Sequence, residues 1–262
     1  MEDTNLNRRD FLKLIIAAVG TLVGAKVGLK SGRAGASPSA PQGPRSWAMV
    51  IDQDKCNGCT YCQAACRASN DIAPNITWNK LYQVDQIGER DIYLSVGCMQ
   101  CENAPCVSVC PVGASYYRDD GIVMMDYDRC IGCRYCQIAC PYDARSFNWQ
   151  TFSGENPAVP TWGEPDISRR PRGVVEKCSF CFQRIDRGLA AGLVPGVDEA
   201  ATPACVNACP SGARLFGDLN DPASPVSLAL AAAPAYRIKE HLGTHPRVYY
   251  LNAQRHSEEQ ES

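Results

Sequence analysis

Hydrophobic and polar residues alternate only over short stretches of this chain, and apolar periodicity is weak throughout. An apolar run at residues 47–51 predicts a first short strand. Two hairpins are expected, each across a turn that contains glycine; their strands cover residues 81–87 with 91–96 and 115–117 with 122–125. Short helices are expected over residues 61–69, 178–190 and 226–233. Brief elements of both kinds predict an α+β fold.

The N-terminus carries a separate pattern, in which Arg8 and Arg9 precede an apolar stretch at residues 14–25 and the small residues Ala34-Gly35-Ala36. This order is typical of a twin-arginine export signal, although Asn7 stands where Ser or Thr is usual. An apolar stretch of 12 residues is shorter than the roughly 20 that a bilayer requires. We therefore expect residues 1–36 to be cleaved and the protein to be periplasmic.

Cysteine is the most informative residue of the chain, because its 16 copies fall into four groups of four, three of which end in Cys-Pro. The first and third groups read C-x2-C-x2-C-x3-C, the bacterial ferredoxin pattern, in which three thiolates bind one iron–sulfur cubane and the fourth binds another. The other two groups keep the opening C-x2-C and the closing C-x3-C-Pro. The groups are therefore expected to work in pairs. They are Cys56, Cys59, Cys62, Cys66; Cys98, Cys101, Cys106, Cys110; Cys130, Cys133, Cys136, Cys140; and Cys178, Cys181, Cys205, Cys209.

Two other uses of these cysteines compete with the cubane interpretation. Eight disulfides would suit an exported chain, but cysteines two residues apart around a tight turn make strained, reducible bridges. Zinc is the stronger competitor, since C-x2-C pairs also bind zinc. A zinc site, however, needs four ligands and explains neither the third cysteine in each turn nor the proline after the fourth. Export in the folded state would let clusters be inserted before the thiols meet an oxidising compartment.

An internal repeat supports a duplicated architecture. Residues 52–66 match residues 126–140 at ten of fifteen positions, and the closing cysteine is followed by Pro-x-x-Ala at Cys110, Cys140 and Cys209. Each unit is a cysteine loop, a short helix and a turn, so the sequence predicts one ferredoxin unit used four times.

Charge and the remaining polar residues exclude other classes of function. Without residues 1–36 the protein has 20 basic and 25 acidic side chains, and four clusters with their thiolates add further negative charge, so we expect no nucleic-acid partner. The three histidines, His241, His245 and His256, lie near the C-terminus without a nucleophile and are expected at the surface. We expect no catalytic residue.

Basic residues sit beside the ligating cysteines, at Lys55, Arg129, Arg134 and Lys177. They would either raise cluster potentials or pair with nearby aspartates as ordinary surface charges. Tyr61 and Tyr135, at equivalent repeat positions, are expected to pack in cluster pockets. Residues 148–176 form an irregular insertion with a basic run at 169–172, for which partner contact and a solvated loop are the two interpretations.

Whole phrases of the sequence resemble a known family. The features that carry the resemblance are the four-group pattern, C-E-N-A-P-C-V-x-V-C-P at 101–111, C-I-G-C-R-Y-C-Q-I-A-C-P-Y-D-A-R at 130–145, G-D-L-N-D-P at 217–222 and the twin-arginine start. They are similar to those of iron–sulfur B subunits of the dimethyl sulfoxide reductase superfamily. Exported tetrathionate and polysulfide reductase subunits, with the related nitrite-reductase carrier, are the branch it resembles most. The chain has Gln100 where many relatives have histidine. It keeps all four cysteines of the third group, which implies four [4Fe–4S] clusters.

The resemblance implies a ligand set for each cluster. Cluster 1 would be held by Cys56, Cys59, Cys62 and Cys209, cluster 2 by Cys178, Cys181, Cys205 and Cys66, cluster 3 by Cys98, Cys101, Cys106 and Cys140, and cluster 4 by Cys130, Cys133, Cys136 and Cys110. It also implies two halves of duplicated dicluster-ferredoxin type. The domains expected are a signal peptide (1–36), a linker (37–46), a first half (47–97 and 178–216), a second half (98–147), an insertion loop (148–177) and a C-terminal docking segment and tail (217–262).

By the same resemblance the clusters relay single electrons between a molybdopterin catalytic subunit, near cluster 1, and a polytopic quinol-handling membrane subunit, near cluster 4. The mature chain itself is expected to have no membrane span, and no catalytic role. The alternative is a free-standing periplasmic electron carrier, for example one that serves nitrite reduction; a zinc-stabilised structural module is the third hypothesis.

Overall fold

The computed structural model describes residue 40 and residues 43–251, which belong to one compact unit, Ser37–Ser262. The export signal predicted over residues 1–36, half of the linker, His256 and the polar tail lie outside the described residues. Within the described part, no helix combines the length and the apolar character that crossing a bilayer requires.

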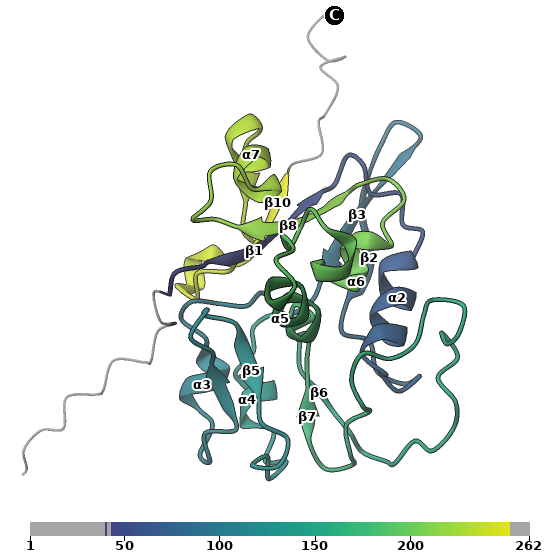
Figure 1. Ribbon diagram of the computed structural model, residues 1–262, viewed down its shortest axis with the longest axis vertical. Coiled ribbons are helices and arrows are strands. Elements are labelled where there is room, and N and C mark those ends of the chain that lie inside the picture. The colour runs from purple at the N-terminus through teal and green to yellow at the C-terminus, as the bar shows by residue number, and fades with distance from the viewer. Residues whose placement is uncertain (1–39, 41–42, 252–262) are drawn as a thin grey trace, which may run out of the picture. The chain divides into compact units, whose positions relative to one another are not determined.

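The central sheet brings the two ends of the described chain together (Figure 1). Its strands are β1 (Trp47–Asp52), β8 (Arg214–Asp218), β9 (Ala235–Tyr236) and β10 (Val248–Leu251), in the order β8-β1-β10-β9. β1 is buried along its whole length, antiparallel to β8 and parallel to β10. Helix α7 (Pro225–Ala232) covers the sheet through Val226, which packs with Ala48 and Val50 of β1.

Both predicted hairpins are present, within about one residue of their expected bounds. β2 (Lys80–Ile87) pairs with β3 (Arg90–Val96), and β4 (Ser115–Tyr117) pairs with β5 (Val123–Met125). A third antiparallel pair, β6 (Ser146–Phe147) with β7 (Val175–Glu176), closes the base of the insertion.

The helices α2 to α6 begin at or just after cysteine loops. α2 (Tyr61–Ser69) has its predicted bounds, whereas α5 (Phe182–Ala190) starts four residues later than expected. The helix starts later because the backbone of Phe180 (φ 55°) and Cys181 (φ 53°) is in the left-handed conformation, which cannot belong to a right-handed helix. The other cysteine helices are single turns: α3 (Pro105–Ser108), α4 (Tyr135–Ile138) and α6 (Ala204–Asn207). Two 3₁₀ turns, Glu199–Ala201 and Glu240–Leu242, complete the helices of the described residues.

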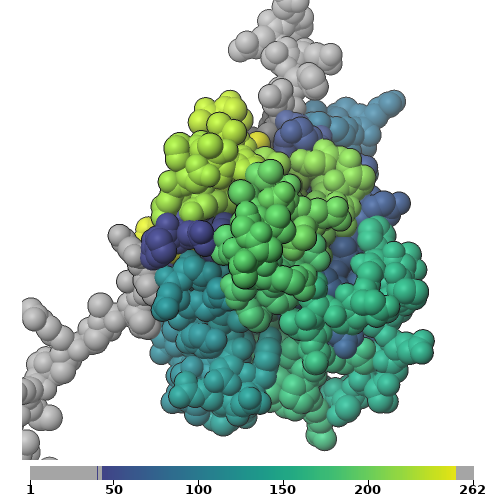
Figure 2. Space-filling model, in the orientation of Figure 1, coloured from purple at the N-terminus to yellow at the C-terminus, as the bar shows by residue number. Residues whose placement is uncertain are grey.

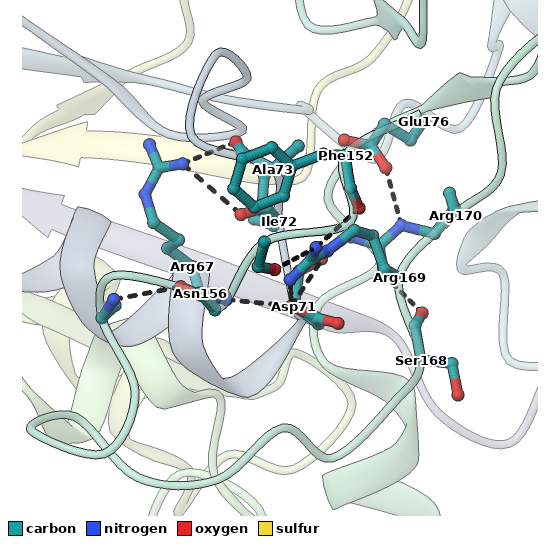
Figure 3. A network of polar contacts seen from close by, with 12 residues as sticks. Arg67, Asp71, Ile72, Ala73, Phe152, Asn156, Ser168, Arg169, Arg170 and Glu176 are labelled. Atoms are coloured by element: carbon teal, nitrogen blue, oxygen red, sulfur yellow. Dashed lines mark hydrogen bonds and ion pairs between the residues drawn. The ribbon is translucent and has the colours of Figure 1, made fainter. Parts of the chain in front are cut away.

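The insertion between β6 and β7 has no regular element but is anchored by charged side chains (Figure 3). Arg169 donates to Asp71 at 2.6 Å, and Arg170 pairs with Glu176 at 2.6 Å, both partners of the second pair being almost fully buried. Asn156 donates to the carbonyl oxygen of Arg67 at 2.9 Å. The loop therefore folds back on the end of α2. It forms part of the molecular surface there (Figure 2). Contact between this loop and a partner stays a prediction.

Asp166 links the same loop to α2 and also to α5. Its carboxylate accepts from Ser69 at 2.6 Å and from Arg187 at 2.9 Å. Burial raises the pKa of Asp166, but these hydrogen bonds and the Arg184 and Arg187 charges outweigh burial and hold the pKa below its ordinary value.

Candidate metal centres

All sixteen cysteines lie in the described residues as free thiols. Most of them sit at the margins of the core, next to residues such as Met49 and Phe180. Cys133 is the one exposed thiol among the sixteen. The disulfide alternative is therefore not the arrangement in this structure.

The cysteine loops of the first and third groups share a backbone conformation that sequence alone explains. Gly58 and Gly132, at equivalent repeat positions, both have positive φ, of 75° and 71°. A Cβ added to Gly58 would lie 2.5 Å from the Tyr93 ring, and one added to Gly132 would lie 2.3 Å from a backbone oxygen. Glycine is required there because the loop both turns left-handed and approaches neighbouring backbone or side chains closely.

The folding brings cysteines from different groups together. Burial and then neighbouring thiols raise the pKa of Cys66, the neighbours being Cys181, Cys178 and Cys205. Burial likewise raises the pKa of Cys56, whose thiol neighbours include Cys62 and Cys209. For Cys101 the same effects, burial first, raise the pKa, and the neighbouring thiols are Cys98, Cys106 and Cys140. Cys136 has Cys110 among its neighbours, and burial raises its pKa too.

Each of these four sets of neighbouring cysteines combines the last cysteine of one group with cysteines from the loop of another group. The assignment of all sixteen ligands stays a prediction, because Cys59, Cys130 and Cys133 join their sets by their positions in the C-x2-C loops. The donor chemistry fits the predicted group: four thiolates packed in a buried site repel one another, and a cationic iron–sulfur core relieves that repulsion. When bound, such a core supplies one-electron oxidation and reduction.

Mononuclear zinc makes a different demand on the side chains. Its ligands must all lie about 2.3 Å from one point, whereas each thiolate of a cubane binds its own iron. Among residues 43–251 no three His, Cys, Asp or Glu side chains lie close enough to hold one ion together.

Electrostatic interactions between cysteines of different sets link each predicted set to the next in number. Cys62 of the first predicted set interacts electrostatically with Cys205 of the second. Cys178 of the second set interacts with Cys98 of the third, and Cys106 of the third with Cys136 of the fourth. The sets thus form a row from the first to the fourth.

The crossing between the second and third sets encloses a small cavity. A cavity of about 30 Å³ lies there, lined by Cys66, Cys98, Cys178 and Cys205 with Met49, Phe180 and Arg214 among the other walls. Such a volume has room for about one water molecule. Lys177, 1% exposed, lies at the same crossing and donates to the carbonyl oxygens of Val123 and, at 2.8 Å, of Cys178.

The other basic residues that sequence singled out have ordinary partners. Lys55 pairs with Asp52 at 3.2 Å and Arg129 with Asp126 at 3.7 Å. Arg134 lies over the ring of Trp149, 4.6 Å from its centroid. Lys55 and Arg129 thus form surface pairs with aspartates, as the second interpretation expected. Arg134 has an aromatic partner instead, and Lys177 lies in the interior.

The expectation for the two tyrosines is wrong. Tyr61 is 46% exposed and Tyr135 is 58% exposed, and each stands at the first position of its helix. The two tyrosine rings therefore do not fill the cluster pockets. His241 and His245 are exposed, as expected.

Sequence reasoning missed two buried arginines that contact cysteine sulfur. The Nη2 of Arg145 lies 3.0 Å from Cys106 Sγ, and the Nη1 of Arg214 lies 4.0 Å from Cys205 Sγ. A signal was available, since both close a Cys-Pro-x-x-Ala-Arg repeat. An arginine is usually exposed, so its place in the repeat did not by itself predict a buried side chain.

A fold built from repeated cysteine loops, with four interlocked thiol sets in a row, defines a ferredoxin-type electron-transfer protein. Known proteins agree: residues 90–156 and 129–213 match the family described as 4Fe-4S dicluster domain, and residues 47–68 match a 4Fe-4S binding domain. The protein accordingly holds four [4Fe–4S] clusters.

Three relatives each match more than three quarters of the chain. The menaquinone reductase iron–sulfur cluster-binding subunit of Nitratidesulfovibrio vulgaris is 44% identical, over 79% of this chain and 88% of that protein. The B subunit of the selenate reductase of Mesobacillus selenatarsenatis is 39% identical, over 78% and 71%. The B component of the polysulfide reductase of Wolinella succinogenes is 37% identical, over 79% and 94%. The protein therefore belongs to the iron–sulfur B subunits of the dimethyl sulfoxide reductase superfamily. It is an electron-transfer subunit and not the catalytic one.

Proposed function

We propose that the protein relays single electrons between a quinol-handling membrane subunit and a molybdopterin catalytic subunit of a periplasmic respiratory oxidoreductase, of tetrathionate, polysulfide or thiosulfate reductase type. Each cluster is held by the set of four cysteines that the family resemblance implies. The names of the relatives support this function, since they include a menaquinone reductase and a polysulfide reductase.

The observation that carries the proposal is the row of thiol sets. Electrostatic interactions between thiols join the first set to the second, the second to the third and the third to the fourth. This arrangement suits electron transfer between two partners, because an electron that enters at one end can pass from each set to its neighbour until it reaches the other end.

The surface around the fourth set supports docking at that end of the row. Cys133 is exposed there, and α3 packs against α4. Exposed apolar side chains surround it: Ile131 (64%), Ile138 (83%) and Trp149 (62%). Apolar groups of this size on a surface are typical of a protein interface. We assign this surface to the membrane subunit, and the end near Cys56 to the catalytic subunit.

Export completes the proposal. The twin-arginine pattern at Arg8 and Arg9 suits a protein whose clusters must be inserted before it leaves the cytoplasm. The protein then reaches the membrane only through its partner subunits.

Purification of the natural complex through a tag on this protein tests the function. We expect a molybdopterin subunit and a membrane subunit to co-purify, and high salt to release the tagged protein from membranes. The same protein expressed alone should not bind lipid vesicles. A cluster-loaded protein that purifies without partners from its natural source would favour the free-standing carrier instead.

A further inference from the structure

Two arginines occupy the same position in two of the cysteine repeats. Arg145 follows the closing cysteine of the third group as Cys-Pro-Tyr-Asp-Ala-Arg, and Arg214 follows that of the fourth as Cys-Pro-Ser-Gly-Ala-Arg. The equivalent residue of the second group is Ser115. The repeat therefore supplies two arginines, and their surroundings differ from those of an ordinary arginine.

Arg145 is 2% exposed and is held by sulfur and hydroxyl acceptors. It donates to Cys106 Sγ at 3.0 Å, to Met125 Sδ at 2.8 Å and to Ser115 Oγ at 2.7 Å. Its strongest charge interactions are with Cys106, Cys136 and Cys98. Cys98 and Cys106 belong to the third predicted set and Cys136 to the fourth, so the guanidinium faces both.

Arg214 stands in the same relation to the other two sets. It is 6% exposed, lies 4.0 Å from Cys205 Sγ, and donates to Asn79 Oδ1 at 2.9 Å and to the Ser95 hydroxyl. Its charge interactions include Cys205 of the second set, with Cys62 and Cys209 of the first. The charges that act most strongly on both guanidinium groups are thus side chains of cysteine and tyrosine, and no carboxylate is among them.

A guanidinium in this position carries a permanent charge, because arginine does not lose its proton in proteins. Both side chains are buried, so solvent screens their charge little and each charge acts on both neighbouring sets. Donation to a ligating sulfur and a nearby positive charge each favour the reduced, more negative form of a cluster.

We propose that Arg145 and Arg214 set the reduction potentials of the clusters, one arginine for each pair. Arg145 raises the potentials of clusters 3 and 4, and Arg214 those of clusters 1 and 2. Each charge also offsets the repulsion between electrons on neighbouring clusters, so a pair accepts its second electron more easily. The pairing rests on the ligand sets proposed above.

Potentiometric titration of the cluster-loaded protein in its complex, followed by electron paramagnetic resonance, tests the proposal. In Arg145→Gln we expect the ratio of reduced to oxidised cluster 3, at fixed ambient potential, to fall at least about tenfold, which is 59 mV for a one-electron couple. Cluster 4 should shift in the same direction and clusters 1 and 2 should not. Arg145→Lys should keep the potentials of clusters 3 and 4 close to those of the unchanged protein, because lysine keeps the positive charge.

Arg134→Gln is the matched control, since it removes the same charge from an exposed position next to Cys133. We expect a shift several-fold smaller there because water screens the charge. Arg214→Gln should move clusters 1 and 2, by less than Arg145→Gln moves cluster 3, since its sulfur contact is 4.0 Å against 3.0 Å.

Iron content separates this role from a structural one. Full iron content with unchanged potentials in both Gln variants would overturn the proposal, as would equal shifts in Arg134→Gln and Arg145→Gln. If Arg145→Gln loses iron, Arg145→Lys becomes the deciding variant: wild-type potentials support the proposal, and lowered potentials overturn it. A shift that falls on one cluster of each half would overturn the ligand sets and leave the effect of the charge intact.

Discussion

The side-chain nitrogen of Gln100 donates a hydrogen bond of 2.8 Å to the carbonyl oxygen of Cys178, and so ties the second cysteine group to the fourth. The other end of the same amide accepts from the backbone nitrogen of Val123 at 2.8 Å. Gln100 is fully buried and has a left-handed backbone, φ 48°. The residue that departs from the pattern of many relatives is therefore a structural link at the crossing between two thiol sets.

Replacement of Gln100 by alanine should destabilise the protein by about 2 kcal/mol, because the buried backbone nitrogen of Val123 loses this acceptor, at a cost of about 1–3 kcal/mol. The carbonyl oxygen of Cys178 loses one donor but keeps the hydrogen bond from Lys177. The measurement is the denaturant concentration at which half of the visible cluster absorbance is lost, under anaerobic conditions. Gln83→Ala is the control: Gln83 also donates to a partner, Asp91, but at the surface, and its loss should change the midpoint little. Equal midpoints for the two variants would contradict the role of Gln100.

The insertion loop should depend on the buried pair of Arg170 with Glu176. Arg170→Met leaves a buried carboxylate without its partner, so we expect a loss of about 3–5 kcal/mol. The double variant Arg170→Met with Glu176→Leu should recover most of that loss. Arg187→Met breaks a pair whose arginine is 58% exposed and should cost less than about 1 kcal/mol. Limited proteolysis of residues 148–174 should follow the same order of variants, and a loop cleaved equally in all of them would refute the anchoring role.

Local patterns of the sequence were sufficient to predict the hairpins, α2 and the grouping of the cysteines. They depend on neighbours in the sequence: a turn with glycine, or a cysteine loop followed by a helix. β10 was not predicted, because its four residues pair with β1 almost 200 positions earlier, as Met49 with Val248, and nothing local indicates such a partner. The segment after residue 217 consequently contributes two strands, β9 and β10, to the central sheet, while its docking role stays a prediction.

The same distinction separates the parts of the site. Spacing identified the sixteen thiols, but only the fold shows that Arg145 faces Cys106 and that Lys177 is buried. Lys55, Arg129 and Lys177 each precede a cysteine in sequence, yet two are at the surface and one is in the interior. Charge next to a ligand in sequence is therefore a poor guide to charge next to a ligand in space.

Conservative replacement of Arg8 and Arg9 by lysine should block export without blocking cluster insertion. The expected result is a brown, cluster-loaded protein that stays in the cytoplasm, because the twin-arginine route is read by sequence rather than by charge. Cell fractionation with visible spectra checks this. Arg33→Lys, also within residues 1–36, is the control and should be exported normally. Normal delivery of the double variant to the periplasm would rule out this export route.

Replacement of Cys133 by serine tests the fourth ligand set and its place in the row. Cys130, Cys136 and Cys110 remain in the proposed set, but one iron loses its soft ligand, so a three-iron cluster is expected. Electron paramagnetic resonance of the oxidised variant should show that species. The potential of this cluster should change with its charge and iron count, so quinol should no longer reduce the rest of the row, whereas dyes should still drive the catalytic subunit.

Cys59→Ser is the matched control for this experiment, because Cys59 holds the equivalent repeat position in the first group. It should also give a three-iron cluster, now at the opposite end, and quinol should still reduce the three remaining cubanes although turnover is lost. The two variants therefore differ in quinol reduction and not in the kind of cluster formed. Identical behaviour in quinol reduction would contradict the proposed direction of the row, and a Cys133→Ser protein with four unchanged cubanes would contradict the ligand set itself.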